Sequence, residues 1–146
     1  MVMGTITSFG SDTDDIIVQL IPKGLTEVAY ETYVSGTLIG YVFVDVPAGD
    51  YTLRVTKPEH AVKEYSVTVG ISDVVQDVTL WLYGDGNHDG LVDVKDAVLI
   101  KKHLASMTVE MDEDVMDVNA DLTIDIKDAV KLMKKLAGMT VELGKA

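Results

Sequence analysis

The stretch Asp85-Gly86-Asn87-His88-Asp89-Gly90-Leu91-Val92-Asp93-Val94-Lys95-Asp96-Ala97 decides the fold of the C-terminal half of the chain, because it occurs twice. Its second copy starts thirty-two residues later and reads Asp117-Val118-Asn119-Ala120-Asp121-Leu122-Thr123-Ile124-Asp125-Ile126-Lys127-Asp128-Ala129. The copies extend without a gap over 85–111 and 117–143, and fifteen of the twenty-seven aligned positions are identical. Such a repeat indicates one structural unit that is built twice.

Oxygen-bearing side chains occupy positions 1, 3, 5, 9 and 12 of each loop, which is the spacing of a calcium-binding loop. Ca²⁺ is a hard ion that takes roughly six to eight oxygen ligands, and position 7 can add its backbone carbonyl. We therefore expect two calcium sites, in loops 85–96 and 117–128. Their predicted ligands are Asp85, Asn87, Asp89, Leu91, Asp93 and Asp96 in the first loop, and Asp117, Asn119, Asp121, Thr123, Asp125 and Asp128 in the second.

Both loops depart from an EF-hand. Position 12 is normally a bidentate Glu, whereas Asp96 and Asp128 are one methylene shorter. Residues 79–83 have the pattern of a strand, so no helix is predicted before the first loop. Leu122 stands where the first loop has Gly90, and a β-carbon at positive φ costs roughly 1 kcal/mol or more. The sequence leaves open whether the second site takes calcium.

A helical pattern with a period of 3.6 follows each loop. Its apolar residues at i, i+3 and i+7 predict a small core between two antiparallel helices. These core residues are Ala97, Ile100 and Leu104 in the first copy, and Ala129, Leu132 and Leu136 in the second. About sixty residues bury little apolar surface, so metal binding is expected to supply much of the folding free energy.

The duplicated loops and their helices resemble the dockerin family over residues 83–146. The resemblance implies two loop-plus-helix units ("F-hands") that bind a cohesin domain of another protein. In that family, loop positions 10 and 11 and the outer helix face contact cohesin. The matching residues are Val94, Lys95, Val98, Leu99, Lys101 and Lys102 in the first copy, and Ile126, Lys127, Val130, Lys131, Met133 and Lys134 in the second. The sequence leaves open whether one or both helices dock, because only a few positions, such as Leu99 against Lys131, break the pseudo-twofold symmetry.

The N-terminal half alternates apolar and polar residues and is rich in Val, Ile, Thr and Tyr, which is typical of strands. Strands are predicted at 5–9, 16–21, 27–34, 38–46, 51–57, 64–69 and 75–82. Seven short strands predict an all-β, immunoglobulin-like sandwich at 1–82, followed by the all-α pair of calcium loops and helices (F-hands) at 83–146. The turn at 46–51 with the strand at 65–69 resembles the carboxypeptidase-regulatory-like family. Before a dockerin, such a sandwich resembles an X module, which implies that it stabilises the dockerin.

Composition excludes several functions. The net charge of −12 disfavours nucleic acid and anionic membranes as partners, and no apolar run is long enough to insert into a membrane. The chain has no cysteine, so disulfides and thiolate metal sites are excluded. The start, Met1 to Gly4, lacks the features of a signal peptide, which suggests a fragment of a longer protein. The histidines show no metal-ligand or triad spacing, and His88 is expected to point to solvent, so we do not expect an enzyme.

We therefore expect a monomeric, non-catalytic assembly module from a secreted or cell-surface protein of a polysaccharide-degrading complex, cellulosome-like or amylosome-like. The principal alternative is a structural calcium-binding module whose β-sandwich binds carbohydrate through an aromatic platform. Candidate platform residues are Tyr30, Tyr33, Tyr41, Trp81 and Tyr83. An intracellular calcium sensor is a weaker alternative. The cohesin type, the polysaccharide and the nature of the parent protein are not encoded in any motif.

Overall fold

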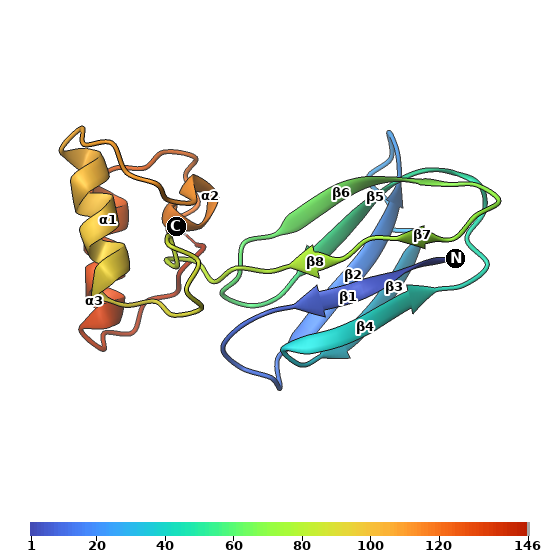
Figure 1. The fold of residues 1–146 in the computed structure, drawn as a ribbon, viewed down its shortest axis with the longest axis horizontal. Helices are drawn as coiled ribbons and strands as arrows, with labels where there is room; N and C mark the ends of the chain where they lie inside the picture. Colours follow the sequence, from blue (N-terminus) through green and yellow to red (C-terminus); the bar gives the residue numbers. More distant parts are fainter. Residues whose placement is uncertain (146) are drawn as a thin grey trace. The chain divides into compact units, whose positions relative to one another are not determined.

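The structure is a computed structural model that describes residues 1–145, and it divides into two compact units (Figure 1). The first unit consists of Met1–Pro58 and Val62–Leu80 and contains only strands. The second begins at Trp81, contains all the helices, and also takes in Glu59–Ala61. The expected order of an all-β module followed by an all-α module is confirmed. The module boundary expected between residues 82 and 83 stays a prediction.

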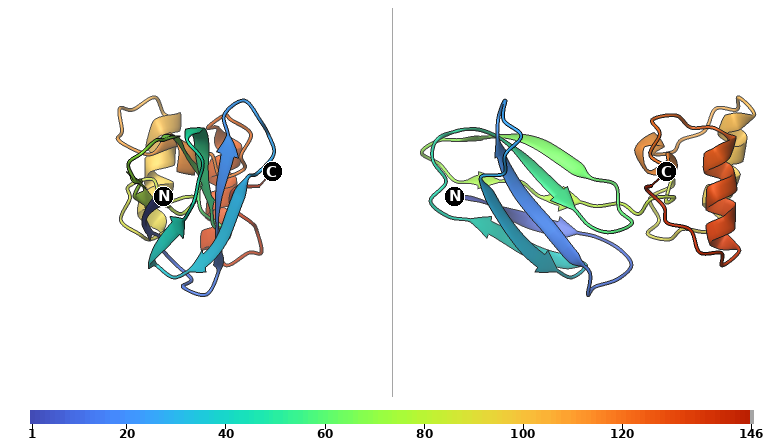
Figure 2. Two further views of the ribbon diagram at one scale, coloured as in Figure 1. Left: turned by 90° about the vertical axis from the view of Figure 1, so that its right-hand side faces the viewer. Right: turned by 180° about the vertical axis from the view of Figure 1, so that it is seen from behind.

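Two four-stranded sheets form the first unit, with strand orders β4-β1-β7/β8 and β3-β2-β5-β6 (Figure 2). All neighbours are antiparallel except β7 and β8, which both run parallel to β1. Alternate residues of the strands point into a shared core, as the apolar alternation predicts. The strands are β1 (Val2–Thr7), β2 (Asp15–Pro22), β3 (Tyr30–Ser35), β4 (Leu38–Phe43), β5 (Gly49–Thr56), β6 (Lys63–Val69), β7 (Val74–Val75) and β8 (Val78–Thr79).

The strand predicted at 75–82 is instead two short strands separated by Gln76 and Asp77. The Gln76 carbonyl accepts a hydrogen bond from the Tyr41 hydroxyl at 2.6 Å, and the backbone N–H of Thr5 donates to Asp77 Oδ1 at 2.9 Å. A β-carbon on Gly4 would lie 2.1 Å from the Gln76 carbonyl oxygen. Glycine at this position therefore lets the interrupted strand approach β1.

Lys57, at the end of β5, is almost completely buried, with 2% of its surface exposed. Its ammonium donates to Ser8 Oγ at 2.9 Å and to the Ser11 carbonyl at 2.6 Å, which ties down the connection between β1 and β2. Burial lowers the pKa of Lys57, while nearby acidic groups raise it. These hydrogen bonds explain how the fold accommodates a buried cation.

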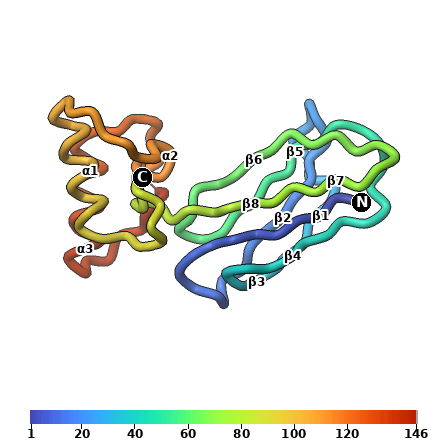
Figure 3. The backbone as a smooth tube through the Cα atoms, viewed as in Figure 1, coloured from blue at the N-terminus to red at the C-terminus, as the bar shows by residue number. Residues whose placement is uncertain are grey.

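The second unit contains α1 (Val94–Leu104), α2 (Glu113–Met116) and α3 (Ile126–Leu136). Helices α1 and α3 lie side by side and antiparallel, and each is entered from one of the two acidic loops (Figure 3). Among residues 1–145, none of the helices combines the length and apolar character that crossing a bilayer requires. The buried core contains Ala61, Ala97, Ile100, Val115, Met116, Val118, Ala129, Leu132 and Leu143.

Two details of this core differ from the expectation. Leu104 and Leu136, predicted as core residues, are 37% and 38% exposed. Their places are taken by Val115 and Met116 of α2 and by Leu143 near the C-terminus. Helix α2 was not predicted from the sequence, because four residues are too few to show helical periodicity.

Candidate functional site

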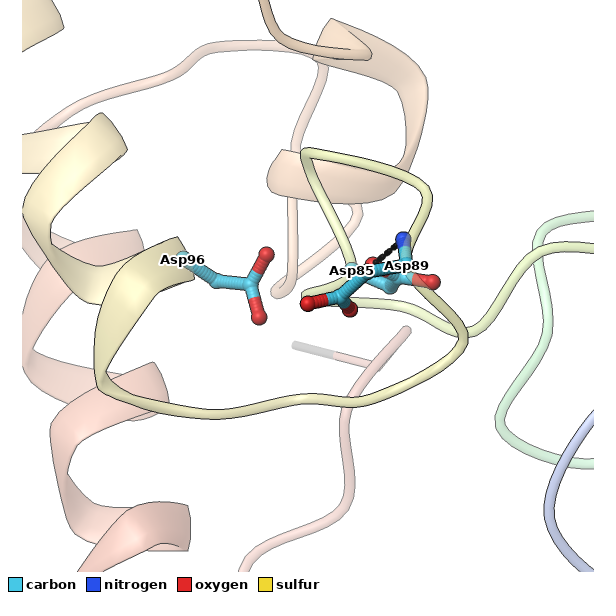
Figure 4. Close-up of side chains that lie close together, drawn as sticks. All are labelled: Asp85, Asp89 and Asp96. Atoms are coloured by element: carbon cyan, nitrogen blue, oxygen red, sulfur yellow. Dashed lines mark hydrogen bonds between the residues drawn. The ribbon is translucent and has the colours of Figure 1, made fainter.

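The first acidic loop holds three carboxylates together (Figure 4). Asp85 and Asp96 are fully buried, Asp89 is exposed, and one carboxylate oxygen of each lies within 4.8 Å of the others. Asp85 Oδ2 accepts from the Gly90 N–H at 2.9 Å, and Asp96 Oδ1 accepts from the Asn87 N–H at 3.4 Å. Backbone donors thus fix the carboxylates at loop positions 1 and 12.

The second loop repeats this arrangement bond for bond. Asp117 Oδ2 accepts from the Leu122 N–H at 2.8 Å, and Asp128 Oδ1 accepts from the Asn119 N–H at 3.3 Å. One oxygen each of Asp117, Asp121 and Asp128 again lies within 4.8 Å of the others. The structure therefore brings the predicted side chains at positions 1, 5 and 12 together in both loops.

Leu122 has a left-handed backbone conformation, as does Gly90 at the equivalent position of the first loop. The φ angle is +68° at Leu122 and +85° at Gly90. Leu122 is also 95% exposed, so its side chain makes no packing that offsets the strain. Leucine in place of glycine at position 122 thus adds backbone strain to the second loop but leaves its hydrogen-bonding pattern unchanged.

The aspartates at position 9 have a different role. Asp93 and Asp125 are the N-caps of α1 and α3, and their side chains accept from the N–H of Lys95 and of Lys127 at 3.0 and 2.8 Å. Neither belongs to the carboxylate clusters. Position 9 of a calcium loop often acts through a water molecule, so this placement is compatible with the predicted ligand set. At position 3, Asn87 Oδ1 and Asn119 Oδ1 each accept an N–H from position 5 of their own loop.

Without a cation, holding the buried carboxylates of each loop close together in their charged form is electrostatically unfavourable. Burial raises the pKa of Asp85, Asp96 and Asp128, although backbone N–H donors partly oppose this shift. The pKa of Asp89 is lowered, chiefly by the Leu91 N–H. An all-oxygen donor set with three carboxylates at close range suits a hard divalent cation, which would compensate both burial and mutual repulsion.

The outer faces of α1 and α3 expose most of the residues predicted to contact a partner. Val94 and Ile126 are 68% and 65% exposed, and the apolar residues one turn later are exposed as well. Leu99 and Lys131 are half-buried. The remaining predicted contact residues are exposed: Lys95, Val98, Lys101, Lys102, Lys127, Val130, Met133 and Lys134. Each helix thus has a solvent-facing apolar strip with lysines beside it.

His88 is exposed, as expected, and its ring also makes two contacts with other segments. Its ring stacks on Trp81 with centroids 4.0 Å apart and planes at 1°, and Nε2 lies 2.7 Å from Asp112 Oδ2. Asp112 is the N-cap of α2, so these contacts connect the first loop to that helix. No sequence spacing signals this contact, because the three residues lie in separate segments.

The aromatic platform expected in the carbohydrate-binding alternative is not assembled. Tyr41 is buried and packs edge-on against Phe43, as does the half-buried Tyr30. Trp81 and Tyr83 are half-buried, so of the five candidate platform residues only Tyr33 is largely exposed, and its hydroxyl donates to Glu31 at 2.6 Å. One exposed tyrosine does not make the row of rings that sugar stacking requires.

Comparisons with solved structures and with family models each found proteins similar to this chain. Among solved structures, the chain is similar to a chain of a type I cohesin–dockerin complex from Clostridium thermocellum, with 33% identity, a TM-score of 0.40, and coverage of 41% of this chain and 97% of that one. It is also similar to two interface mutants of a type II cohesin–X-dockerin complex from Acetivibrio cellulolyticus, at 21% and 20% identity, each with a TM-score of 0.41 and coverage of 91% of this chain and 92% of the other. No curated protein matches the chain. The family model of the dockerin type I domain matches residues 83–137, and through this segment the chain belongs to the dockerin family.

Proposed function

We propose that this chain is a calcium-ordered adaptor that attaches its parent protein to a cohesin domain. Dockerin modules are non-catalytic assembly domains, so the function is binding rather than chemistry. One observation carries the proposal. The position-12 aspartate of each loop is buried beside the other carboxylates and is also part of the capping box of a helix whose outer face is exposed. The same residue therefore connects cation binding to the partner surface.

We infer two calcium sites. Asp85, Asp89 and Asp96 would hold the first ion, with Asn87 and the Leu91 carbonyl as further oxygen ligands. Asp117, Asp121 and Asp128 would hold the second with Asn119 and the Thr123 carbonyl, and Asp93 and Asp125 act through water or as helix caps. The matching hydrogen bonds of the two loops support equal ligand geometry. Bound calcium would neutralise the clustered carboxylates and so stabilise the start of each helix.

The proposed cohesin contacts are the exposed apolar positions of α1 and α3 with the lysines beside them. Burying such a strip against a partner would release water from apolar surface, while the lysines at its rim would favour the correct register. The contact positions at the two helix starts are equivalent in the two copies, namely Val94 with Lys95 and Ile126 with Lys127.

The first unit fits the role of an X module, since a complete β-sandwich precedes the dockerin without a Pro- or Ser-rich linker. The segment Glu59–Ala61, which lies between β5 and β6 in the sequence, belongs to the second unit. Ala61 is part of that unit's core, and Lys135 pairs with Glu59 at 3.1 Å. A segment that the chain places between two strands of the first unit thus completes the core of the second, and this supports a stabilising role for the first module. Extracellular modules bind calcium with dissociation constants of about 10⁻⁴–10⁻³ M, so ordering by calcium suits a secreted or cell-surface parent in a cellulosome-type complex.

Calorimetric titration against a panel of type I and type II cohesins, in calcium and in EDTA, tests the proposal. Calcium-dependent binding to one class is expected, and Val94→Asp combined with Ile126→Asp should abolish it, because two buried charges would replace apolar contacts. Thr37→Asp combined with Ser66→Asp, at two exposed positions of the β-sandwich, is a charge-matched control that should leave binding unchanged. Binding of calcium without binding of any cohesin would contradict the adaptor function.

A further inference from the structure

We propose that helix α2 couples the two calcium loops, and that His88 is the positioning residue through which the first loop acts on this helix. The inference rests on the two calcium sites of the proposed function and adds how they regulate each other. Loops coupled in this way fill cooperatively, so that an ion in one loop raises the calcium affinity of the other.

Helix α2 is a single turn that leads directly into the second loop (Figure 1). The N–H of its N-cap, Asp112, donates to the Gly86 carbonyl of the first loop at 3.0 Å. Its C-cap is Asp117, the proposed ligand at position 1 of the second loop. Inside the turn, the Met116 N–H donates to the Asp112 carbonyl at 3.2 Å. One hydrogen-bonded turn therefore connects a contact with the first loop to the first ligand of the second.

The His88 side chain fixes Asp112 at the start of this turn. The His88 Nε2 lies 2.7 Å from Asp112 Oδ2, and because an ionised carboxylate only accepts, the ring donates this hydrogen bond. The other oxygen, Asp112 Oδ1, accepts from the Asp114 N–H at 3.0 Å and so caps α2. Trp81 stacks on the imidazole and holds its plane. The two oxygens of Asp112 thus connect the first loop to the helix.

His88 is placed where it can respond to an ion in the first loop. It occupies position 4, between the proposed ligands Asn87 and Asp89, and its φ is +59°. Asn87 Oδ1 accepts the Asp89 N–H at 3.2 Å and closes the backbone around it. An ion that holds both neighbours also fixes the direction in which the His88 side chain leaves the loop. A filled first loop therefore presents the imidazole to Asp112 in one orientation.

The second copy makes the same backbone contact without the pair of side chains. At the repeat offset of thirty-two, His88 corresponds to Ala120 and Asp112 to Gly144. The Gly144 N–H donates to the Val118 carbonyl at 2.6 Å, which is the equivalent of the bond from Asp112, and Ala120 has φ +57°. The second loop thus keeps its shape without such a pair. The pair occurs in the copy whose capped helix leads into another calcium loop, which favours a role in coupling.

Calorimetric calcium titrations measure the coupling factor, which is the overall constant for two ions divided by the product of the constants of two one-site variants, Asp85→Asn and Asp117→Asn. The unchanged chain should give a factor of at least about fivefold. Adding Asp112→Ser to all three proteins should reduce it below about twofold, because serine still caps α2 but is too short to reach His88. Asp114→Ser removes the same charge from an exposed position of α2 and should leave the factor unchanged.

A double-mutant cycle separates this contact from a general loss of stability. His88→Asn keeps a residue that tolerates positive φ, and it should lower the coupling factor as much as Asp112→Ser does. Combining the two changes should lower the factor no further, since both remove one contact. Independent structural effects would instead add.

Far-UV circular dichroism in calcium checks that each variant folds. If a one-site variant does not fold, calcium titrations followed by the fluorescence of Trp81, the one tryptophan, are compared with those followed by helical circular dichroism. The two midpoints should coincide in the unchanged chain and differ by at least about threefold after Asp112→Ser, because Trp81 reports the first loop alone.

Several results would overturn the coupling and leave both calcium sites standing: a factor near one in the unchanged chain, a factor or midpoints that Asp112→Ser does not change, or an equal loss from Asp114→Ser. If the unchanged chain binds no calcium, the proposed sites fail and this inference fails with them.

Discussion

Replacing Leu122 with glycine should strengthen the second calcium site. The residue has φ +68°, and the left-handed region costs an L-residue roughly 1–2 kcal/mol. Glycine removes that cost but loses more backbone entropy on ordering, roughly 0.5–1 kcal/mol. Because the leucine side chain is 95% exposed, almost no burial is lost. The net gain is about 0.7 kcal/mol, which corresponds to about threefold in calcium affinity if the loop is ordered only when calcium binds.

Two further variants isolate the cause. Gly90→Leu, at φ +85°, should weaken the first site by about 1 kcal/mol or more, since it introduces the same strain. Leu122→Ala keeps the β-carbon and removes only exposed atoms, so calcium affinity should not change. Two-site calcium titration by calorimetry measures all three proteins. Equal effects of Leu122→Ala and Leu122→Gly, or weaker binding after Leu122→Gly, would show that backbone strain does not limit the second site.

Three other outcomes are expected. EDTA should remove the helical far-UV signal of the second unit while the first unit, which has its own core, still unfolds cooperatively on heating; an unchanged spectrum would contradict this. Lys57→Met should destabilise the first unit by about 2–3 kcal/mol in urea unfolding, because the oxygens of Ser8 and Ser11 lose a charged donor, and Lys57→Arg should cost less. In EDTA, residual helicity should rise as pH falls from 7 to 5, because burial raises the pKa of Asp85, Asp96 and Asp128 and the folded form then binds more protons than the unfolded form. With calcium the sign should reverse, since protons compete with the ion, and thermal melts at both pH values measure the two trends.

Local patterns account for what the sequence predicted well. The loop spacing fixes which backbone N–H groups can reach Asp85 and Asp117, so the two clusters follow from the order of residues within twelve positions. The strand alternation likewise predicts the sandwich, because side-chain period depends only on neighbouring residues. The predicted ends of the strands were less accurate. The strand predicted at 38–46 ends at Phe43, because Asp45 has φ +56°, which lies outside the β region.

Contacts between distant segments account for what the sequence did not predict. The position of His88 depends on Trp81 and Asp112, and the break between β7 and β8 depends on Gly4 accepting a close carbonyl from Gln76. Neither of these contacts produces a periodic pattern in the sequence from which it could be predicted. The role of Asp93 and Asp125 as helix caps was also missed, although Asp three residues before another acid at a helix start is a recognisable capping pattern.

The two copies are expected to depend on each other even if only one of them docks. Each loop has its own cluster and starts its own helix, but Ile100 of α1 and Leu132 of α3 are buried in one common core. Loss of the first ion, for example through Asp85→Ala, would free the start of α1 and so weaken the packing that holds α3. Cohesin binding through one helix face should therefore fall when a ligand of the other loop is removed, although that ligand touches no partner. Under this coupling, a calcium site whose own helix makes no contact with the partner would still be needed, because it would stabilise the helix that does.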